Sequence, residues 1–281
     1  MRKIKIVADS SADLLALEEV DFAHTPMKII TAQREFVDDA SIDADEMTDF
    51  LAEYKGKSQT SCPNPSDWLE AFDDADDVIC VTITSALSGS YNSACTAKKI
   101  YESENIGKRV FVLDTLSAGP EITMAVRKLG EYVREGREFE DICRDIKEYI
   151  KNTGLVFMLK SLKNFANNGR VSPIVAKLVG IAGICIVGKA SDEGTLEPLH
   201  KIRGEKRTID ALFEEMKKFG FRSGKVSIGH CQNEQAALTL KEKIMAEFKH
   251  ARVEIHKMRG LCSFYAEKGG MLVGFEKAIE A

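Results

Sequence analysis

Short apolar runs alternate with amphipathic stretches along most of the chain. The runs IKIVAD (4–9), VICVTI (78–83) and RVFVL (109–113) are typical of buried strands, and each leads into a hydroxyl-rich turn and then a helical pattern. PMKII (26–30) offers a further short strand. This rhythm of strand, turn and helix predicts a largely parallel sheet with helices on both faces.

The helical stretches show the matching periodicity. From Met47 to Tyr54, apolar residues recur every three or four positions, which puts them on one helical face. A longer helical stretch covers residues 119–152 and is broken near Gly136. Hydroxyl residues are expected to cap the helices that follow strands, and the candidate caps are Ser10 or Ser11, Ser66, and Ser88 or Ser90.

The second half restarts with the strand LVFML (155–159). Two further runs, GICIV (183–187) and PLHKI (198–202), predict a hairpin around Asp192-Glu193-Gly194. Helix, strand (VSIGH), helix and strand (RVEIH) complete this half before a glycine-containing tail. The order is that of an α/β domain with a less regular, mixed sheet.

We therefore predict an α/β fold of two α/β domains, at residues 1–153 and 154–281. The first holds a largely parallel sheet and the second a mixed sheet. Ligands of such sheets collect where loops leave the carboxyl ends of the strands. This rule places Asp9 to Ser11, Thr84 to Ser93 and Asp114 to Ser117 along one rim.

Composition narrows the class of protein. The net charge is −5, with acidic and basic residues scattered along the chain, so no basic face indicates nucleic acid. No run approaches the ~20 apolar residues of a membrane-spanning helix, and the apolar start is too short for a signal peptide. The seven cysteines lack C-x-x-C spacing. Buried free thiols in a reducing, cytoplasmic compartment are the expectation.

The stretch TSALSGSYNSA (84–94) carries the most concentrated chemistry. A hydroxyl without a neighbouring base is a poor nucleophile, and the G-x-S-x-G elbow is missing. Hydroxyls beside a helix N-terminus suit an anion such as a carboxylate or phosphate. The stretch is therefore interpreted as an anion cradle or, at its simplest, as a helix cap.

Two further segments bear on the same rim. Thr60 and Ser61 precede a stiff Pro-x-Pro turn, which either positions them or is an ordinary strand-to-helix turn. The turn Asn167-Asn168-Gly169 delivers a single Arg170 before an apolar stretch. Arg170 is either a surface residue or the partner of a carboxylate.

Nucleotide and metal sites are not indicated. The sequence contains neither G-x-x-x-x-G-K-[ST] nor a G-x-G-x-x-G after a strand. The acidic runs at 37–46 and 73–77 are interpreted as solvated faces. We predict no catalytic residue, no metal and no cofactor.

Seven motifs in order resemble the DegV family over nearly the whole chain. They are IVADSSADL, TSCPNPSDWLEAF, ITSALSGSYNSA, VLDTLSAGP, LKNFANNGRV, EPLHKIRG and IGHCQNEQAALTL. The resemblance implies a bacterial lipid-binding protein, not an enzyme, that holds one long-chain fatty acid such as palmitate in a tunnel between its domains. It further implies a role in fatty acid metabolism or lipid transport. The partner that it implies is the ATP-binding subunit of a fatty acid kinase, which converts the presented carboxylate to acyl phosphate.

The resemblance also implies a ligand-binding set. Thr60 and Ser93 would hydrogen-bond the carboxylate, Ser61, Ser88 and Gly89 would shape the pocket, and Arg170 would lie beneath the network. Tyr265 stands where the family usually has a histidine, and Glu267-Lys268-Gly269 replaces its G-P-G. A tyrosine donates a hydrogen bond but cannot carry a positive charge.

Two alternatives remain open at this point. A self-contained acyl or phosphoryl transferase would need a nucleotide site or a base-activated nucleophile. A divergent regulatory or protein-binding paralogue would fit the missing histidine. No motif in the sequence specifies the preferred acyl chain length, the kinase partner or the oligomeric state.

Overall fold

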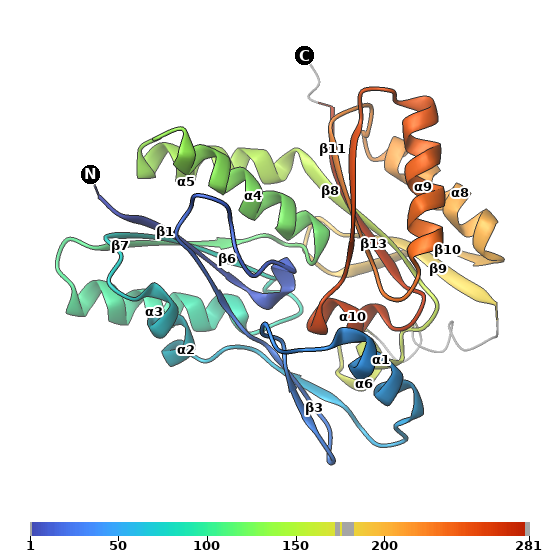
Figure 1. Cartoon of the computed structure of the whole chain (residues 1–281), viewed down its shortest axis with the longest axis horizontal. Coiled ribbons are helices and arrows are strands. Elements are labelled where there is room, and N and C mark those ends of the chain that lie inside the picture. The colour runs from blue at the N-terminus through green and yellow to red at the C-terminus, as the bar shows by residue number, and fades with distance from the viewer. Residues whose placement is uncertain (1, 172–174, 176–182, 279–281) are drawn as a thin grey trace.

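The computed structural model describes residues 2–171, 175 and 183–278. Figure 1 shows the first sheet with helices above and below it, and a second, larger sheet beside it with its own helices on the outer side. The N-terminus lies at the end of the first part that is remote from the second. The predicted class, two α/β units with different sheets, is confirmed.

The first sheet, sheet A, is wholly parallel in the order β2-β1-β6-β7. Its strands are β1 (Ile4–Asp9), β2 (Phe22–Thr25), β6 (Asp77–Thr82) and β7 (Arg109–Asp114). Two helices on each face cover it, namely α2 (Pro65–Phe72), α3 (Ser90–Glu104), α4 (Pro120–Arg134) and α5 (Phe139–Lys151). The gap between α4 and α5 contains Gly136 with φ of 70°, which confirms the predicted break.

A small antiparallel sheet, sheet B, was not foreseen. It has the order β4-β3-β5 and consists of β3 (Lys28–Ile30), β4 (Glu35–Val37) and β5 (Gln59–Ser61). The PMKII strand thus belongs to this sheet and not to the parallel one. Helices α1 (Ala44–Glu53) and α10 (Gly260–Ala266) pack on it, and Ile29, Met47 and Phe264 share one apolar cluster.

The second large sheet, sheet C, is mixed, with the order β10-β9-β8-β13-β11-β12. Its strands are β8 (Thr153–Leu159), β9 (Ile184–Ala190), β10 (Leu196–Arg203), β11 (Lys225–His230), β12 (Arg252–Lys257) and β13 (Met271–Glu276). The β9–β10 hairpin is confirmed. The tail is a correction: β13 inserts between β8 and β11 because its apolar side chains complete the sheet's core.

Helices complete this half. Helices α8 (Glu205–Lys218) and α9 (Glu234–Glu247) pack on the outer face, and the short α6 (Lys163–Asn167) follows β8. Helix α4 lies between the two large sheets and is buried along most of its length. The division after residue 153 stays a prediction, since α10 of the second half packs within the first.

The helix caps differ from those expected. Asp9, not Ser10 or Ser11, caps the 3₁₀ helix η1 (Ser10–Ala12). Asn64 caps α2 in a capping box with Asp67, and Pro65 fills the first helical position in place of a Ser66 cap. Helix α3 starts after Gly89 without a side-chain cap, although the Ser88 hydroxyl accepts the N–H of Ser90 at 3.2 Å.

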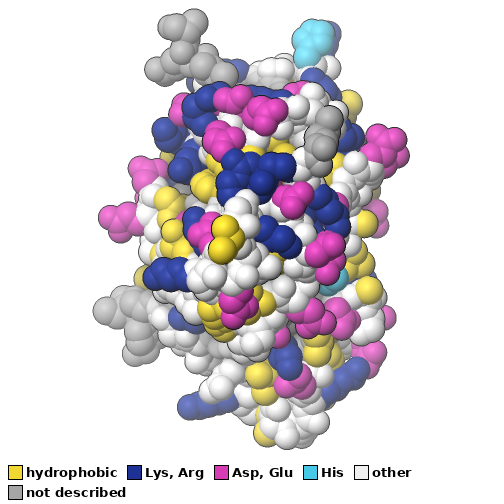
Figure 2. Space-filling view, turned by 90° about the vertical axis from the view of Figure 1, so that its left-hand side faces the viewer, with side chains coloured by type: hydrophobic (Ala, Val, Ile, Leu, Met, Phe, Trp, Pro, Cys, Tyr) yellow, Lys and Arg dark blue, Asp and Glu magenta, His cyan; other side chains and the backbone are white. Residues whose placement is uncertain are grey.

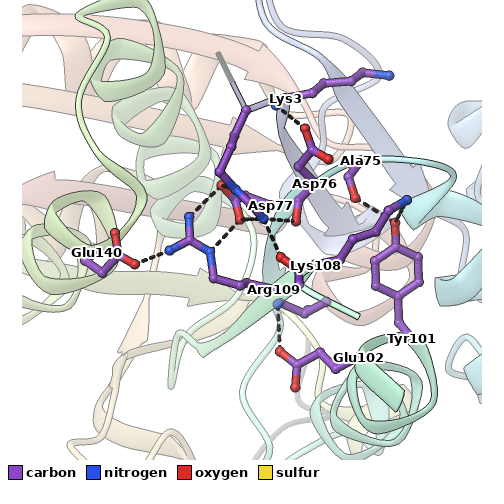
Figure 3. Close-up of polar contacts among 12 residues, drawn as sticks. Lys3, Ala75, Asp76, Asp77, Tyr101, Glu102, Lys108, Arg109 and Glu140 are labelled. Atoms are coloured by element: carbon purple, nitrogen blue, oxygen red, sulfur yellow. Dashed lines mark hydrogen bonds and ion pairs between the residues drawn. The ribbon is translucent and has the colours of Figure 1, made fainter. Parts of the chain in front are cut away.

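An ion-pair network holds the amino ends of the sheet A strands. The buried Asp77 carboxylate accepts hydrogen bonds from Arg2 and Arg109, at 2.7 to 2.9 Å, and Arg109 also contacts Glu140 (Figure 3). Burial alone would raise the pKa of Asp77, but the hydrogen bonds from Arg109 and Arg2 outweigh it and lower that pKa. This network joins parts of the fold to one another and lies at the end of sheet A opposite the carboxyl rim.

Candidate ligand-binding cavity

A cavity of about 350 Å³ lies between the carboxyl rim of sheet A and one face of sheet C. Its walls come from β5, from the loops after β6 and β7, from β8 and β13, from the tip of the β9–β10 hairpin and from α10. This volume is within the range of small-molecule sites, and most of the lining is apolar.

Strand β8 supplies the apolar floor. Leu155, Phe157 and Leu159 alternate along the strand and line the cavity, while Val156 and Met158 point into the core beneath α8 and α9. The sequence LVFML is apolar at every position because both faces of this strand are buried.

Asp9 organises the rim of sheet A. Its buried carboxylate accepts the Ile83 N–H at 2.9 Å, the Ser90 hydroxyl at 2.6 Å, and both the N–H and the hydroxyl of Ser11. Burial, against these hydrogen bonds, raises its pKa. The rim predicted from the sequence is therefore tied together, and the loop after β6 that lines the cavity is fixed at its start.

The polar end of the cavity combines three segments. The Thr60 and Tyr265 hydroxyls lie 2.8 Å apart in a hydrogen bond, and the Thr60 N–H donates to Asn168 Oδ1 at 3.3 Å. The Tyr265 ring packs on Phe165 at 4.7 Å between centroids. Threonine, tyrosine and the turn before Arg170 are thus brought together from distant parts of the chain.

The structure places most of the predicted set on this cavity. Thr60, Ser61, Ser88, Gly89, Arg170 and Tyr265 line it. Ser93 is not among the lining residues, but its hydroxyl oxygen is buried without a hydrogen-bond partner in the described part of the chain. Arg170 is exposed, and no ion pair joins it to a carboxylate among residues 2–171, 175 and 183–278, so of the two alternatives for this residue its position favours the surface one.

Two aspartates from the first half hold α10, which carries Tyr265. Asp38 accepts the N–H groups of Gly260 and Leu261, each at 2.9 Å, and Asp13 accepts that of Arg259 at 2.9 Å. A Cβ on Gly260 would lie 2.8 Å from the Asp38 carboxyl, so glycine is needed for this approach. The acidic run at 37–46 was predicted to be a solvated face, and for Asp38 this prediction is wrong, because its side chain is fully buried.

The second oxygen of Asp13 faces His256 across the two halves. Asp13 Oδ2 and His256 Nε2 lie 3.9 Å apart, and neither has a hydrogen bond within the described residues. Burial, with the charge of Asp38, raises the pKa of Asp13 to about 8. Burial, with Arg127 and His230, lowers the pKa of His256 to about 4. Both groups are therefore neutral in the folded protein near neutral pH.

These pKa values predict a pH-dependent stability. Asp13 stabilises the folded state most at low pH and loses this contribution as pH rises through about 8. His256 contributes above its ordinary pKa of 6.5 and loses that contribution as pH falls toward 4. Of these two groups, only Asp13 changes its contribution between pH 6.5 and 8, so Asp13→Asn is expected to remove about 2 kcal/mol of pH dependence in urea unfolding. Asp39→Asn, at a partly exposed carboxyl whose pKa is lowered, is the control. An unchanged pH dependence in Asp13→Asn would contradict the prediction.

A second hollow is a poorer candidate. It lies beside β7, between α3 and α5, and its volume is about 830 Å³. Its charged lining is largely paired internally, as with Lys98–Glu102, Arg109–Glu140 and Lys151–Glu148. The face of the molecule seen in Figure 2 intersperses basic and acidic side chains in the same way. Paired charges leave little to orient a ligand.

Other kinds of site were searched over the described residues. No group of three or more His, Cys, Asp or Glu side chains there could hold a metal ion. No helix in the same part of the chain is long and apolar enough to cross a membrane. All seven cysteines lie in that part and are free thiols.

Comparison with known proteins decides the family. The family model described as "Uncharacterised protein, DegV family" matches residues 3–278. The chain belongs to the DegV family. A DegV domain-containing protein of Streptococcus pneumoniae strain R6 is 40% identical over 276 residues, which is 97% of this chain and 98% of the relative.

Solved DegV structures share the fold. The S. pneumoniae Fatty Acid Kinase (Fak) B3 protein, loaded with linoleic acid, is 40% identical with a TM-score of 0.96, covering 98% of this chain and 100% of that one. A DegV family protein from Eubacterium eligens, loaded with heptadecanoic acid, is 39% identical with a TM-score of 0.95 and the same coverage.

Sequence reasoning missed part of this DegV cavity. Phe165, Cys62 and Cys262 line it, as do Thr84 and Ser117. The two hydroxyl residues lay within the predicted rim, and that position was the available signal. Nothing local to Cys262 or Phe165 indicates a ligand, since apolar residues near helices are usually core.

Proposed function

We propose that this DegV protein binds one long-chain fatty acid in the cavity between sheets A and C. The observation that carries the proposal is an apolar cavity with a hydroxyl cluster at one end. Burial of ~15 methylenes at ~0.8 kcal/mol each contributes on the order of 10 kcal/mol, so the tail supplies the affinity. The similar S. pneumoniae and E. eligens proteins, loaded with linoleic and heptadecanoic acid, support this assignment.

The carboxylate is assigned to the Thr60–Tyr265 end. Thr60 and Ser93 are proposed to donate hydrogen bonds to it, with Ser61, Ser88 and Gly89 shaping the wall. The buried, unpaired Ser93 hydroxyl supports a role for this residue, because such groups in native proteins have partners. Arg170, which lacks a carboxylate partner among the described side chains, supplies the positive charge nearby.

We further propose that the protein is a non-catalytic subunit that presents the carboxylate to a kinase. Ser61, Gly89 and Arg170 are exposed at this end, so a partner can reach the head group. The partner would transfer the terminal phosphoryl group of ATP to a carboxylate oxygen, leaving ADP and an acyl phosphate. The name of the similar Fatty Acid Kinase B3 protein supports such a partner, and seven free thiols support a reducing, cytoplasmic compartment.

Native mass spectrometry of the purified protein, followed by denaturing lipid extraction, tests the binding role. We expect one co-purifying fatty acid per chain, or stoichiometric uptake of palmitate or oleate on incubation. Absence of lipid after incubation would favour the divergent regulatory paralogue. ATP turnover by the isolated protein would instead favour a self-contained transferase.

Removal of the two head-group hydroxyls is expected to weaken binding. For Thr60→Ala/Ser93→Ala we expect a 10- to 30-fold higher Kd for palmitate, from about 1 kcal/mol per hydrogen bond. Arg170→Ala is expected to weaken binding as well. The control Ser66→Ala/Thr96→Ala removes two exposed helical hydroxyls; equal affinity in both double variants would mean that the head-group assignment is wrong.

Tyr265→His tests the kinase proposal. A histidine at this position can carry positive charge beside the acyl carboxylate, so acyl phosphate formation with an added fatty acid kinase subunit is expected to increase. Tyr265→Phe keeps the ring contact with Phe165 and serves as the control. If the histidine variant supports the same rate as the native protein, Tyr265 does not contact the head group.

A further inference from the structure

The cavity has a second polar wall that the head-group assignment does not use. Thr84 and Ser117 both line it, and their side chains are almost fully buried, with residue exposures of 1% and 3%. The Thr84 N–H donates to the Ser117 carbonyl at 2.9 Å, which holds the two residues side by side at the rim. Buried hydroxyls on an apolar cavity wall need a hydrogen-bonding explanation.

The pairing of the strands places this wall away from the carboxylate end. In sheet C, Val156 of β8 pairs with Lys189, so Leu155 lies level with the hairpin tip, where Gly194 contacts Thr84. Leu159, at the other end of β8, leads into α6 and Phe165, which packs on Tyr265. Leu155 and Leu159 are four residues apart, about 13 Å along a strand. Thr84 and Ser117 therefore lie near the far end of the floor.

Within the described residues, the Thr84 hydroxyl keeps an unused hydrogen-bond donor and the Ser117 hydroxyl keeps an unused acceptor. Thr84 Oγ1 accepts the Ala86 N–H at 3.2 Å, but its own proton goes to no acceptor in the described part of the chain. Ser117 donates its proton to the buried Glu121 carboxyl. The Thr153 hydroxyl donates to the other oxygen of the same carboxyl, at 2.6 Å. The Ser117 oxygen accepts no hydrogen bond from any described residue and can take one from a ligand. One free donor and one free acceptor thus belong to two neighbouring residues that line the same cavity.

We infer that the cavity accepts a long-chain fatty acid with a hydroxyl group in the distal half of its chain. A ligand hydroxyl is both donor and acceptor, so it can accept from Thr84 and donate to Ser117 at once. A ketone would satisfy Thr84 alone, and an unsubstituted chain would leave the buried Thr84 donor unsatisfied. Each C–C bond of ~1.5 Å advances an extended chain by a little over 1 Å, so ~13 Å corresponds to roughly ten carbons.

The inference rests on the proposed function, and the experiment separates the two. Stearate and 12-hydroxystearate compete for the delipidated protein, and native mass spectrometry reads the bound ratio. The native protein is expected to prefer the hydroxy acid about tenfold. Thr84→Val and Ser117→Ala are each expected to reduce this preference to about threefold or less. Thr84→Ser, which keeps the hydroxyl, is expected to retain it.

Thr82→Val is the matched control, because Thr82, the last residue of β6, is as buried as Thr84 two positions later but is not among the residues lining the cavity. Stearate binding without any preference for the hydroxy acid in the native protein would overturn this inference and leave the proposed function intact. A preference that Thr84→Val and Ser117→Ala both retain would also overturn it. Failure to bind either acid would overturn the proposed function itself.

Discussion

Asp9→Ala is expected to lower the free energy of unfolding by about 3 to 5 kcal/mol and to abolish tight fatty acid binding. The substitution leaves the Ile83 N–H and the hydroxyls of Ser11 and Ser90 without their acceptor inside the protein. Buried donors left unsatisfied cost about 1 to 3 kcal/mol each. The loop from Ile83 to Gly89 lines the cavity, so its loosening also affects the ligand. Urea unfolding and palmitate binding measure the two effects.

The control for this prediction is Asp43→Ala. Asp43 also accepts two backbone N–H groups, at 2.9 and 3.0 Å, but it caps α1 at an exposed position. A loss of about 1 kcal/mol is expected there, without loss of binding. If Asp9→Ala and Asp43→Ala lost the same unfolding free energy and both kept palmitate binding, Asp9 would contribute no more than an exposed helix cap does.

Gly194→Val is expected to destabilise the protein by about 3 kcal/mol and to weaken fatty acid binding at least tenfold. Gly194 has φ of 76°, where a side chain costs about 1 to 2 kcal/mol. A Cβ at this position would also lie 2.1 Å from Thr84 Oγ1, so the hairpin tip must move off the rim of sheet A. That movement opens the far end of the cavity, and overpacking of this kind typically costs 1 to 3 kcal/mol.

Gly136→Val separates the two causes. Gly136 has a similar φ of 70°, but nothing lies within 4 Å of an added Cβ. It should show the backbone cost in a thermal or urea melt and bind palmitate normally. If the Gly194 variant binds as tightly as the Gly136 variant, the hairpin tip does not close the cavity.

The candidate site shows how far local pattern reaches. Apolar runs and helical spacing predicted β1, β6 and β7 of sheet A, though not its edge strand β2, and they also predicted the break near Gly136 and the β9–β10 hairpin, since each depends on neighbouring residues. The rule that ligands collect at carboxyl ends of parallel strands then placed Thr84 to Ser93 along the rim, and Thr84, Leu87, Ser88 and Gly89 of this stretch line the cavity. Strand β13 was missed because glycines in and before this run weaken the local strand signal. Its assignment as a strand depends on its pairing with β8 and β11, which are distant in the sequence.

By itself the sequence determined the α/β class, the family motifs and most of the polar residues on the cavity wall. Only the tertiary structure decided that Thr60 meets Tyr265 across 205 positions, that Asp38 anchors α10, and that Ser93 lies off the lining. The physical reason is range. Periodicity and turn chemistry act over a few residues, whereas hydrogen bonds between distant segments depend on how the sheets pack together.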